Sequence, residues 1–353
     1  MGSDPADVLG PLAGGRVNET YLLADSRGLL VLQRINPAVF PLPHLVTDNL
    51  VRVWRHLAAQ RSRQSPALGR WCFPEPVPGI DGRFFLADSD GADWRLVRHI
   101  PGSAMQVIDR PFHARAMGQC LADLHSLLAS ADIAEYGDTL PGFHCLDRYL
   151  AAYDRCSQLH DPENLLDVVW CRDQIALGRP RAKTLQQAAD DGRLRCQLVH
   201  GDPKVANFLF TPGDSSQLLG LIDFDTVKPG LLLHDLGDCL RSVANPDEES
   251  SLAPTLRLDL CRALLEGYLS RASGLLTADD LALLPDAPWT MTFELGLRFF
   301  SDHLAGDRYF RVGLHGDNLR RARSQFLLAE QFCAARDFFV SMIRDSQVVL
   351  GMA

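Results

Sequence analysis

Four side chains in the middle of this sequence have the types and the spacing that phosphate chemistry needs. Asp202 and Asn207 lie five residues apart with Lys204 between them, and Asp223 follows Asn207 by sixteen residues. An amide and a carboxylate are hard oxygen ligands of the kind that Mg²⁺ prefers. A second carboxylate can orient a hydroxyl and accept its proton, and a lysine can meet a phosphate as a point charge. We therefore predict Asp202 and Lys204 as catalytic residues, and Asn207 and Asp223 as metal ligands.

The order of these residues matches a known pattern. Residues 200–207 fit the H-x-D-x-x-x-x-N catalytic loop of kinase-fold phosphotransferases, and residues 222–225, Ile-Asp-Phe-Asp, supply the aspartate with which this fold holds magnesium. Either segment alone is more often a turn or a solvated acidic pair, but the two in this order indicate phosphoryl transfer from ATP. Apolar residues flank both segments, so we expect a strand–loop–strand hairpin with Asp223 at the end of a buried strand, 218–224.

Asp225 stands where protein kinases have glycine. We predict it as a further acid on the metal side or the phosphate side of the site. The alternative is that it caps a short helix.

Composition and charge exclude several other classes. The net charge of −9 argues against nonspecific nucleic-acid binding, and no apolar run approaches the roughly 18 residues of a membrane span. Residues 1–10 lack the basic and apolar regions of a signal peptide. The nine cysteines are odd in number and widely spaced, which favours reduced thiols in the cytoplasm. Nothing in the composition implies an obligate protein partner.

The first hundred residues are expected to form a small β-rich lobe that binds nucleotide. A glycine turn leads into one strand, and 29–35 forms the next. Gly14 and Gly15 would let backbone N–H groups approach phosphates, with Asn18 beside them. Kinases carry the nucleotide lysine on the following strand, but here the available cation is Arg34, which is otherwise a surface arginine.

Two further nucleotide-side residues follow. Helical spacing over 47–57 places Asp48 where this fold has the acid that pairs with the strand cation, although near a helix start it is also a candidate cap. After two more strands, 84–86 and 94–97, the pattern breaks at 98–102. We interpret that break as the hinge where backbone groups meet adenine, with His99 within it or simply on its surface.

The rest of the chain is expected to be mainly helical around the catalytic hairpin. Helical spacing covers 112–129, 144–157, 163–191, 252–274, 288–306 and 317–346. We therefore predict an α+β, protein-kinase-like bilobal fold. A β-rich N-lobe with one helix spans 1–100, and a helical C-lobe spans 101–353 and carries the catalytic loop, the metal loop and the acceptor pocket.

The chain resembles the superfamily of aminoglycoside phosphotransferases and choline kinases, and within it the N-acetylhexosamine 1-kinase group. Beyond the catalytic loop, which the whole superfamily shares, the resemblance to this group is carried by residues 31–40, 140–144, 222–230, 235–238, 294–312 and 318–326. The group more often has asparagine where this chain has Gly201 and threonine where it has Pro203, so the shape of the loop beside the acceptor differs.

The resemblance implies an ATP-dependent and Mg²⁺-dependent kinase that converts N-acetylglucosamine or N-acetylgalactosamine to its 1-phosphate. It also implies that Arg298 and Tyr309 contact the sugar, with Asp202 facing the hydroxyl and His144 as a further pocket residue. Arg298 and Tyr309 could instead be a buried ion pair and a packed ring. Two alternatives stay open: a kinase of another acceptor (an aminoglycoside, a choline-like amine or another sugar) and a nucleotide-binding regulator without catalysis.

Overall fold

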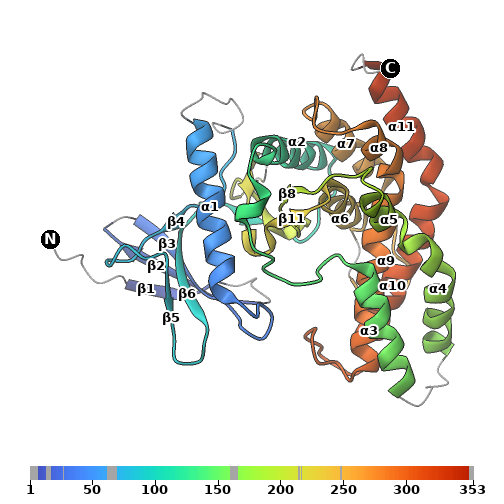
Figure 1. Ribbon diagram of the computed structural model, residues 1–353, viewed down its shortest axis with the longest axis horizontal. Helices are drawn as coiled ribbons and strands as arrows, with labels where there is room; N and C mark the ends of the chain where they lie inside the picture. Colours follow the sequence, from blue (N-terminus) through green and yellow to red (C-terminus); the bar gives the residue numbers. More distant parts are fainter. Residues whose placement is uncertain are drawn as a thin grey trace.

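The computed structural model describes residues 7–12, 17–26, 28–61, 70–159, 166–213, 215, 217–246 and 249–349. Over these residues the chain forms a sheet-rich N-terminal part and a larger helical part, shown in blue and in green to red in Figure 1. This confirms the predicted α+β class with two unequal parts. The N-terminal elements are β1 (Asp7–Pro11), β2 (Glu19–Asp25), β3 (Gly28–Arg34), α1 (Pro43–Arg61), β4 (Pro76–Val77), β5 (Phe85–Ala87) and β6 (Asp93–Arg98).

The N-terminal sheet is antiparallel, in the order β1-β2-β3-β6-β4, with β5 also paired to β6. One face buries a small apolar cluster made by Leu23, Leu30 and Val77. Side chains alternate between the faces of a strand, so the cross-strand pair Gln33 and Arg95 lies on the opposite face from Leu30. That face carries the charged side chain of Arg95, which contacts the predicted metal loop.

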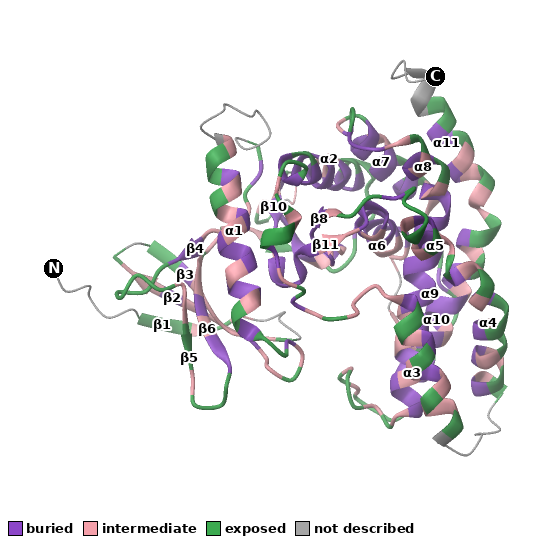
Figure 2. Ribbon diagram, viewed as in Figure 1, coloured by how far each residue is buried: buried purple, intermediate pink, exposed green. Residues whose placement is uncertain are grey.

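The helical part is built around one large apolar core, the buried purple region in Figure 2. α9 packs against α3, α4, α6 and α10, while α2 packs against α7. None of the helices among the described residues is long and apolar enough to cross a bilayer. The helices are α2 (Pro111–Leu128), α3 (Leu146–Leu159), α4 (Leu166–Ala182), α5 (Thr184–Asp190), α6 (Leu232–Ala244), α7 (Leu258–Leu269), α8 (Ala278–Leu283), α9 (Ala287–Leu304), α10 (Asp317–Ala334) and α11 (Arg336–Val349).

The helical segments were located correctly from their spacing, but two of them are divided. Residues 317–346 form α10 and α11, which meet at Ala335, and residues 163–191 contain both α4 and α5. Residue 335 is neither glycine nor proline, so the helical spacing of apolar residues continues across it. The sequence therefore does not indicate the break between α10 and α11.

The catalytic hairpin has the predicted strand–loop–strand form. β9 (Phe208–Phe210) pairs with β10 (Leu218–Leu221), and β8 (Gln197–Val199) pairs with β11 (Lys228–Gly230). A two-residue strand, β7 (Ser103–Ala104), pairs with β9 and follows directly on the hinge segment. The strand before the metal loop ends at Leu221, two residues earlier than Asp223, so Asp223 lies on the loop itself.

Candidate active site

One buried carboxylate holds the backbone of the catalytic loop. Asp235, in the first turn of α6, accepts hydrogen bonds from the backbone N–H groups of His200 (2.7 Å) and Gly201 (2.8 Å). His125 on α2 contributes a third contact, Nε2 to Asp235 Oδ2 at 2.9 Å. Burial acts to raise the pKa of Asp235, but the hydrogen bond and the charge of His125 together hold it below its ordinary value. Asp235 therefore stays ionised and fixes the loop, a role that its spacing did not predict.

Gly201 is required by the geometry of this loop. Its φ is +88°, and a Cβ there would lie 2.6 Å from the carbonyl oxygen of Thr226 on the metal loop. Only glycine fits both conditions without displacing the neighbour. The glycine at this position therefore allows the catalytic and metal loops to approach closely.

The predicted catalytic residues meet in the structure. Lys204 Nζ donates to Asp202 Oδ2 at 2.5 Å, and Asn207 Nδ2 donates to the Asp202 backbone carbonyl at 2.7 Å. Burial disfavours the charged form of Lys204, but the charges of Asp202 and Asp223 outweigh it and raise its pKa. Lys204 therefore stays protonated beside the candidate base.

Asp223 lies next to this group in a left-handed conformation, with φ +68°. Its neighbour Ile222 donates its backbone N–H to the Asn207 carbonyl at 2.9 Å, which ties the metal loop to the catalytic loop. Desolvation by surrounding atoms and the charge of Asp225 raise the pKa of Asp223 above its ordinary value, although the residue is exposed. The crowding of carboxylates here suits a bound cation.

Asp225 connects the metal loop to the N-terminal sheet. One carboxylate oxygen accepts from Arg95 Nη2 and the other from Asn18 Nδ2 at 2.5 Å. Arg95 also donates to Gln33 Oε1 at 3.1 and 2.9 Å, and the Arg95–Asp225 pair is almost fully buried. Asp225 was assigned to the metal from the sequence, but the structure shows both of its oxygens bonded to N-terminal side chains. Asn18 therefore contacts the metal loop, and its assignment to the nucleotide side stays a prediction.

Arg34 lies away from this group. Its guanidinium pairs with Asp88 (2.7 Å), Asp90 (3.1 Å) and Glu19 (3.3 Å). Because Arg34 follows Gln33 in an extended strand, its side chain points to the face opposite Arg95. The strand cation that contacts the metal loop is therefore Arg95, which sequence reasoning missed. The sequence feature that could have indicated Arg95 was a charged residue at a position of strand 94–97 whose side chain faces the protein interior.

The other residues predicted on the nucleotide side are Asp48, His99, Gly14 and Gly15. Asp48 lies in the second turn of α1, which begins at Pro43, so it does not cap the helix. Its neighbour Asn49 is buried, with Nδ2 donating to the carbonyls of Gly137 and Val227, both at 2.8 Å. His99 follows β6 in the segment predicted to be the hinge, and its backbone N–H donates to the Leu29 carbonyl oxygen at 3.1 Å. Gly14 and Gly15 lie outside the described residues.

His144 links α9 to the catalytic loop. Its Nε2 lies 2.7 Å from the Gly201 carbonyl oxygen, and its Nδ1 lies 2.9 Å from Glu294 Oε1. Both partners accept, so both ring nitrogens must carry a proton and His144 is an imidazolium. Burial acts against that charge, but Glu294 and the Gly201 carbonyl outweigh it and raise the pKa of His144. The neighbouring His234 stays neutral, because burial and the His144 charge lower its pKa to about 4. His144 is thus placed to position the loop.

The His144–Glu294 pair predicts a pH-dependent stability. The pKa of His144 is raised in the folded state, so its contribution is complete below about pH 6.5 and is lost as the pH rises through the raised value. His144→Gln is expected to cost about 1–3 kcal/mol at pH 6, because a charge-assisted hydrogen bond is lost. Thermal unfolding of both proteins from pH 5 to 9 should show a difference that shrinks as the pH rises. A difference that stays constant over this range would contradict the imidazolium.

Arg298 and Tyr309, the predicted sugar contacts, lie close together. The Arg298 guanidinium carbon is 5.9 Å from the ring centre of Tyr309, and 5.1 to 5.4 Å from three other aromatic rings. Burial opposes the charge of Arg298, but the surrounding phenols and Glu294 raise its pKa. The three other aromatic rings around the Arg298 guanidinium belong to Phe143, Tyr149 and Phe310.

The segment with Tyr309 is fixed by Asp302, near the end of α9. The carboxylate of Asp302 accepts the backbone N–H groups of Arg308 (3.0 Å), Tyr309 (2.8 Å) and Phe310 (2.9 Å). Three backbone bonds to one carboxylate fix the course of the segment, which leaves the Tyr309 side chain half exposed. The aromatic ring is therefore held beside Arg298 and open to a ligand.

The catalytic loop presents the aspartate Asp202 and the amide Asn207, and the adjoining metal loop presents the carboxylate Asp223. An antiparallel sheet is tied to these loops. This arrangement defines a protein-kinase-like phosphotransferase. Residues 8–273 match the model of the phosphotransferase enzyme family, and the chain belongs to that family.

Solved structures with low sequence identity share the fold. A microcompartment-associated aminopropanol kinase is 19% identical, with a TM-score of 0.64 and 94% of each chain covered. An aminoglycoside phosphotransferase from Alicyclobacillus acidocaldarius is 16% identical, with a TM-score of 0.63, covering 96% of this chain and 92% of its own. A choline kinase from Cryptosporidium parvum is 11% identical, with a TM-score of 0.59, covering 95% and 91%. These matches confirm the predicted kinase-like fold.

Proposed function

We propose that this enzyme transfers the γ-phosphoryl group of ATP to the anomeric hydroxyl of an N-acetylhexosamine, GlcNAc or GalNAc, and releases the sugar 1-phosphate. The observation that carries the proposal is the charge on the acceptor side. Glu294 is paired with His144, and Asp238 is paired with Arg241 at 2.8 Å. Arg298 adds a cation enclosed by aromatic rings. An amine acceptor would meet this cation, whereas a neutral sugar meets no repulsion.

Arg298 and Tyr309 supply hydrogen bonds suited to a sugar. A planar guanidinium and a phenol can donate to ring hydroxyls or to an acetamido carbonyl oxygen. Four aromatic rings surround the Arg298 guanidinium, so little rotamer entropy is lost when a ligand binds. Aromatic rings around it also offer apolar surface for the face of a pyranose ring.

Asp202 would orient the anomeric hydroxyl and accept its proton as the new phosphorus–oxygen bond forms in line. The ring oxygen of the sugar withdraws charge from this hydroxyl, which makes it more acidic than an ordinary alcohol, so a carboxylate is a sufficient base. Lys204 holds the Asp202 carboxylate at 2.5 Å and presents a positive charge for the γ-phosphate.

Asn207 and Asp223 would hold Mg²⁺. The Asn207 amide nitrogen is occupied by the Asp202 carbonyl, so its oxygen is the atom available as a ligand. Desolvation and the charges of Asp225 and Asp202 raise the pKa of the exposed Asp223, and a divalent ion would offset this crowding of carboxylates. Bound there, Mg²⁺ would neutralise charge on the phosphate oxygens. Asn18 and the hinge at His99 remain the proposed nucleotide side in the N-terminal part.

A panel of acceptors tests the substrate class. ATP consumption is measured with GlcNAc, GalNAc, their methyl glycosides, aminopropanol, choline and kanamycin. We expect turnover with the two free sugars and none with the methyl glycosides, since these lack the anomeric hydroxyl. Turnover with the amines but not with the sugars would overturn the proposal.

The same assay compares two arginine variants. Arg298→Met is expected to raise the KM for the sugar by about 10- to 100-fold without changing the KM for ATP, because it removes a charged hydrogen bond worth about 1.5–3 kcal/mol. Arg308→Met, on the same side of the molecule but exposed, is the matched control and should leave both constants near wild type.

A further inference from the structure

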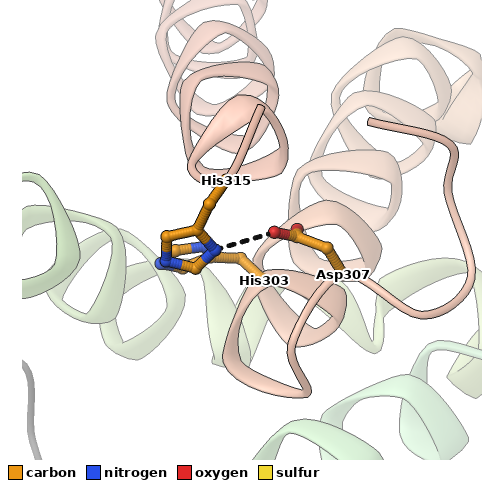
Figure 3. Close-up of side chains that lie close together, drawn as sticks. All are labelled: His303, Asp307 and His315. Carbon is orange, nitrogen blue, oxygen red and sulfur yellow. Dashed lines mark hydrogen bonds and ion pairs between the residues drawn. The ribbon is translucent and has the colours of Figure 1, made fainter. Parts of the chain in front are cut away.

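Three metal-ligating side chains come together where α9 ends and α10 begins. His303 lies in the last turn of α9, and Asp307 and His315 lie in the segment that connects it to α10. Each residue offers one ligand atom, and these atoms all lie within 4.8 Å of one another. Figure 3 shows the Asp307 carboxylate directed at the His315 ring, with the His303 ring beside it. The phosphotransfer site makes no use of this cluster.

The Asp307 carboxylate is held in place by a hydrogen bond to each of its two oxygens. Its Oδ1 accepts from Asn318 Nδ2 at 2.8 Å, and its Oδ2 accepts from His315 Nδ1 at 3.0 Å. The side chain is only 7% exposed. An amide that orients one carboxylate oxygen while the other faces two imidazoles is the outer-shell support that metal-ligating carboxylates have.

The two imidazole rings differ in their exposure to solvent. His303 is buried, whereas the His315 side chain is 72% exposed. Their ring centres are 5.2 Å apart with an angle of 30° between the planes. Ligand atoms of a tetrahedral zinc site with bonds of 2.0–2.1 Å lie about 3.3 Å apart. The His315 Nδ1 to Asp307 Oδ2 distance of 3.0 Å is already near that value, and the ligand atoms of all three residues lie within 4.8 Å of one another.

We propose that His303, Asp307 and His315 bind one Zn²⁺ ion, with solvent in the fourth position. Two imidazoles and a carboxylate suit zinc, while Mg²⁺ prefers oxygen ligands alone. The ion would join the end of α9 to the segment that carries Tyr309, next to the Asp302 contacts that already fix it. The zinc site stands independently of the proposed sugar kinase activity.

Calorimetry on the full-length protein tests the site. Protein treated with a chelator and dialysed is titrated with zinc chloride, without nucleotide. Wild type is expected to bind one equivalent, and His315→Ala should bind at least about tenfold more weakly, because a ligand is lost. His44→Ala, which removes an exposed histidine of α1, is the control and should bind as wild type does.

Cobalt provides a second readout. Co²⁺ in a tetrahedral site gives visible absorption bands, and Asp307→Asn should weaken them while keeping a residue that tolerates the left-handed backbone at 307. Wild type that binds no stoichiometric zinc would overturn the proposal. Undiminished uptake by His315→Ala would overturn it as well, since the metal would then be held by other residues.

Discussion

Asp202→Asn is expected to lower kcat by about 10²- to 10⁴-fold while the KM for ATP stays within a few-fold of wild type. The substitution keeps the shape of the side chain but removes the carboxylate that accepts the proton of the hydroxyl. Asn207 bonds to the backbone carbonyl of Asp202, which the substitution leaves in place, and Asp235 still holds the backbone of the loop. Steady-state kinetics with saturating acceptor measure the effect.

The thermal midpoint separates a catalytic from a structural role of Asp202. The Asp202 charge adds to the crowding that raises the pKa of Asp223, so removing it relieves repulsion at the same time as it breaks the pair with Lys204. The two changes oppose each other, and Tm should stay close to wild type. If Asp202→Asn kept wild-type turnover, the assignment of the base would fail. If Tm fell along with kcat, the loss would be one of folding.

The catalytic loop was predictable because its chemistry is local. Asp202, Lys204 and Asn207 lie within six residues, and apolar strands on both sides fix their context. The hairpin, the helical segments and the two unequal parts followed from periodicity for the same reason. Asp235 was visible only as part of a segment of family resemblance, because its task depends on meeting a loop 34 and 35 residues away.

Contacts between the two parts of the molecule could not be predicted. Arg95 is separated from Asp225 by 130 residues, and nothing near either residue shows that they meet. Sequence reasoning assigned the cation to Arg34, on the strand that pairs with that of Arg95, because the position of the kinase lysine was the only guide. The period of two in a strand gives the face of each residue only after the pairing of the strands is known, and pairing is a property of the whole fold.

The pair of Arg95 and Asp225 should therefore dominate the coupling between the sheet and the metal loop. The side chains are 3% and 5% exposed. Removing one partner of a buried ion pair leaves an uncompensated charge and typically costs about 3–5 kcal/mol. Arg95→Met is expected to destabilise the protein by about this amount, which corresponds to roughly 2–4 °C in Tm for each kcal/mol.

A double variant separates the ion pair from simple packing. Asp225→Asn in the Arg95→Met background removes the uncompensated charge, so more than half of the lost Tm should return even though no contact is restored. Arg34→Met is the matched control, because Arg34 is on the neighbouring strand and pairs with three acids, two of which are more than half exposed. It should shift Tm far less than Arg95→Met. Equal losses from Arg95→Met alone and from the double variant would mean that the buried charge of Asp225 is not what the arginine compensates, and that Arg95 acts through packing against the sheet.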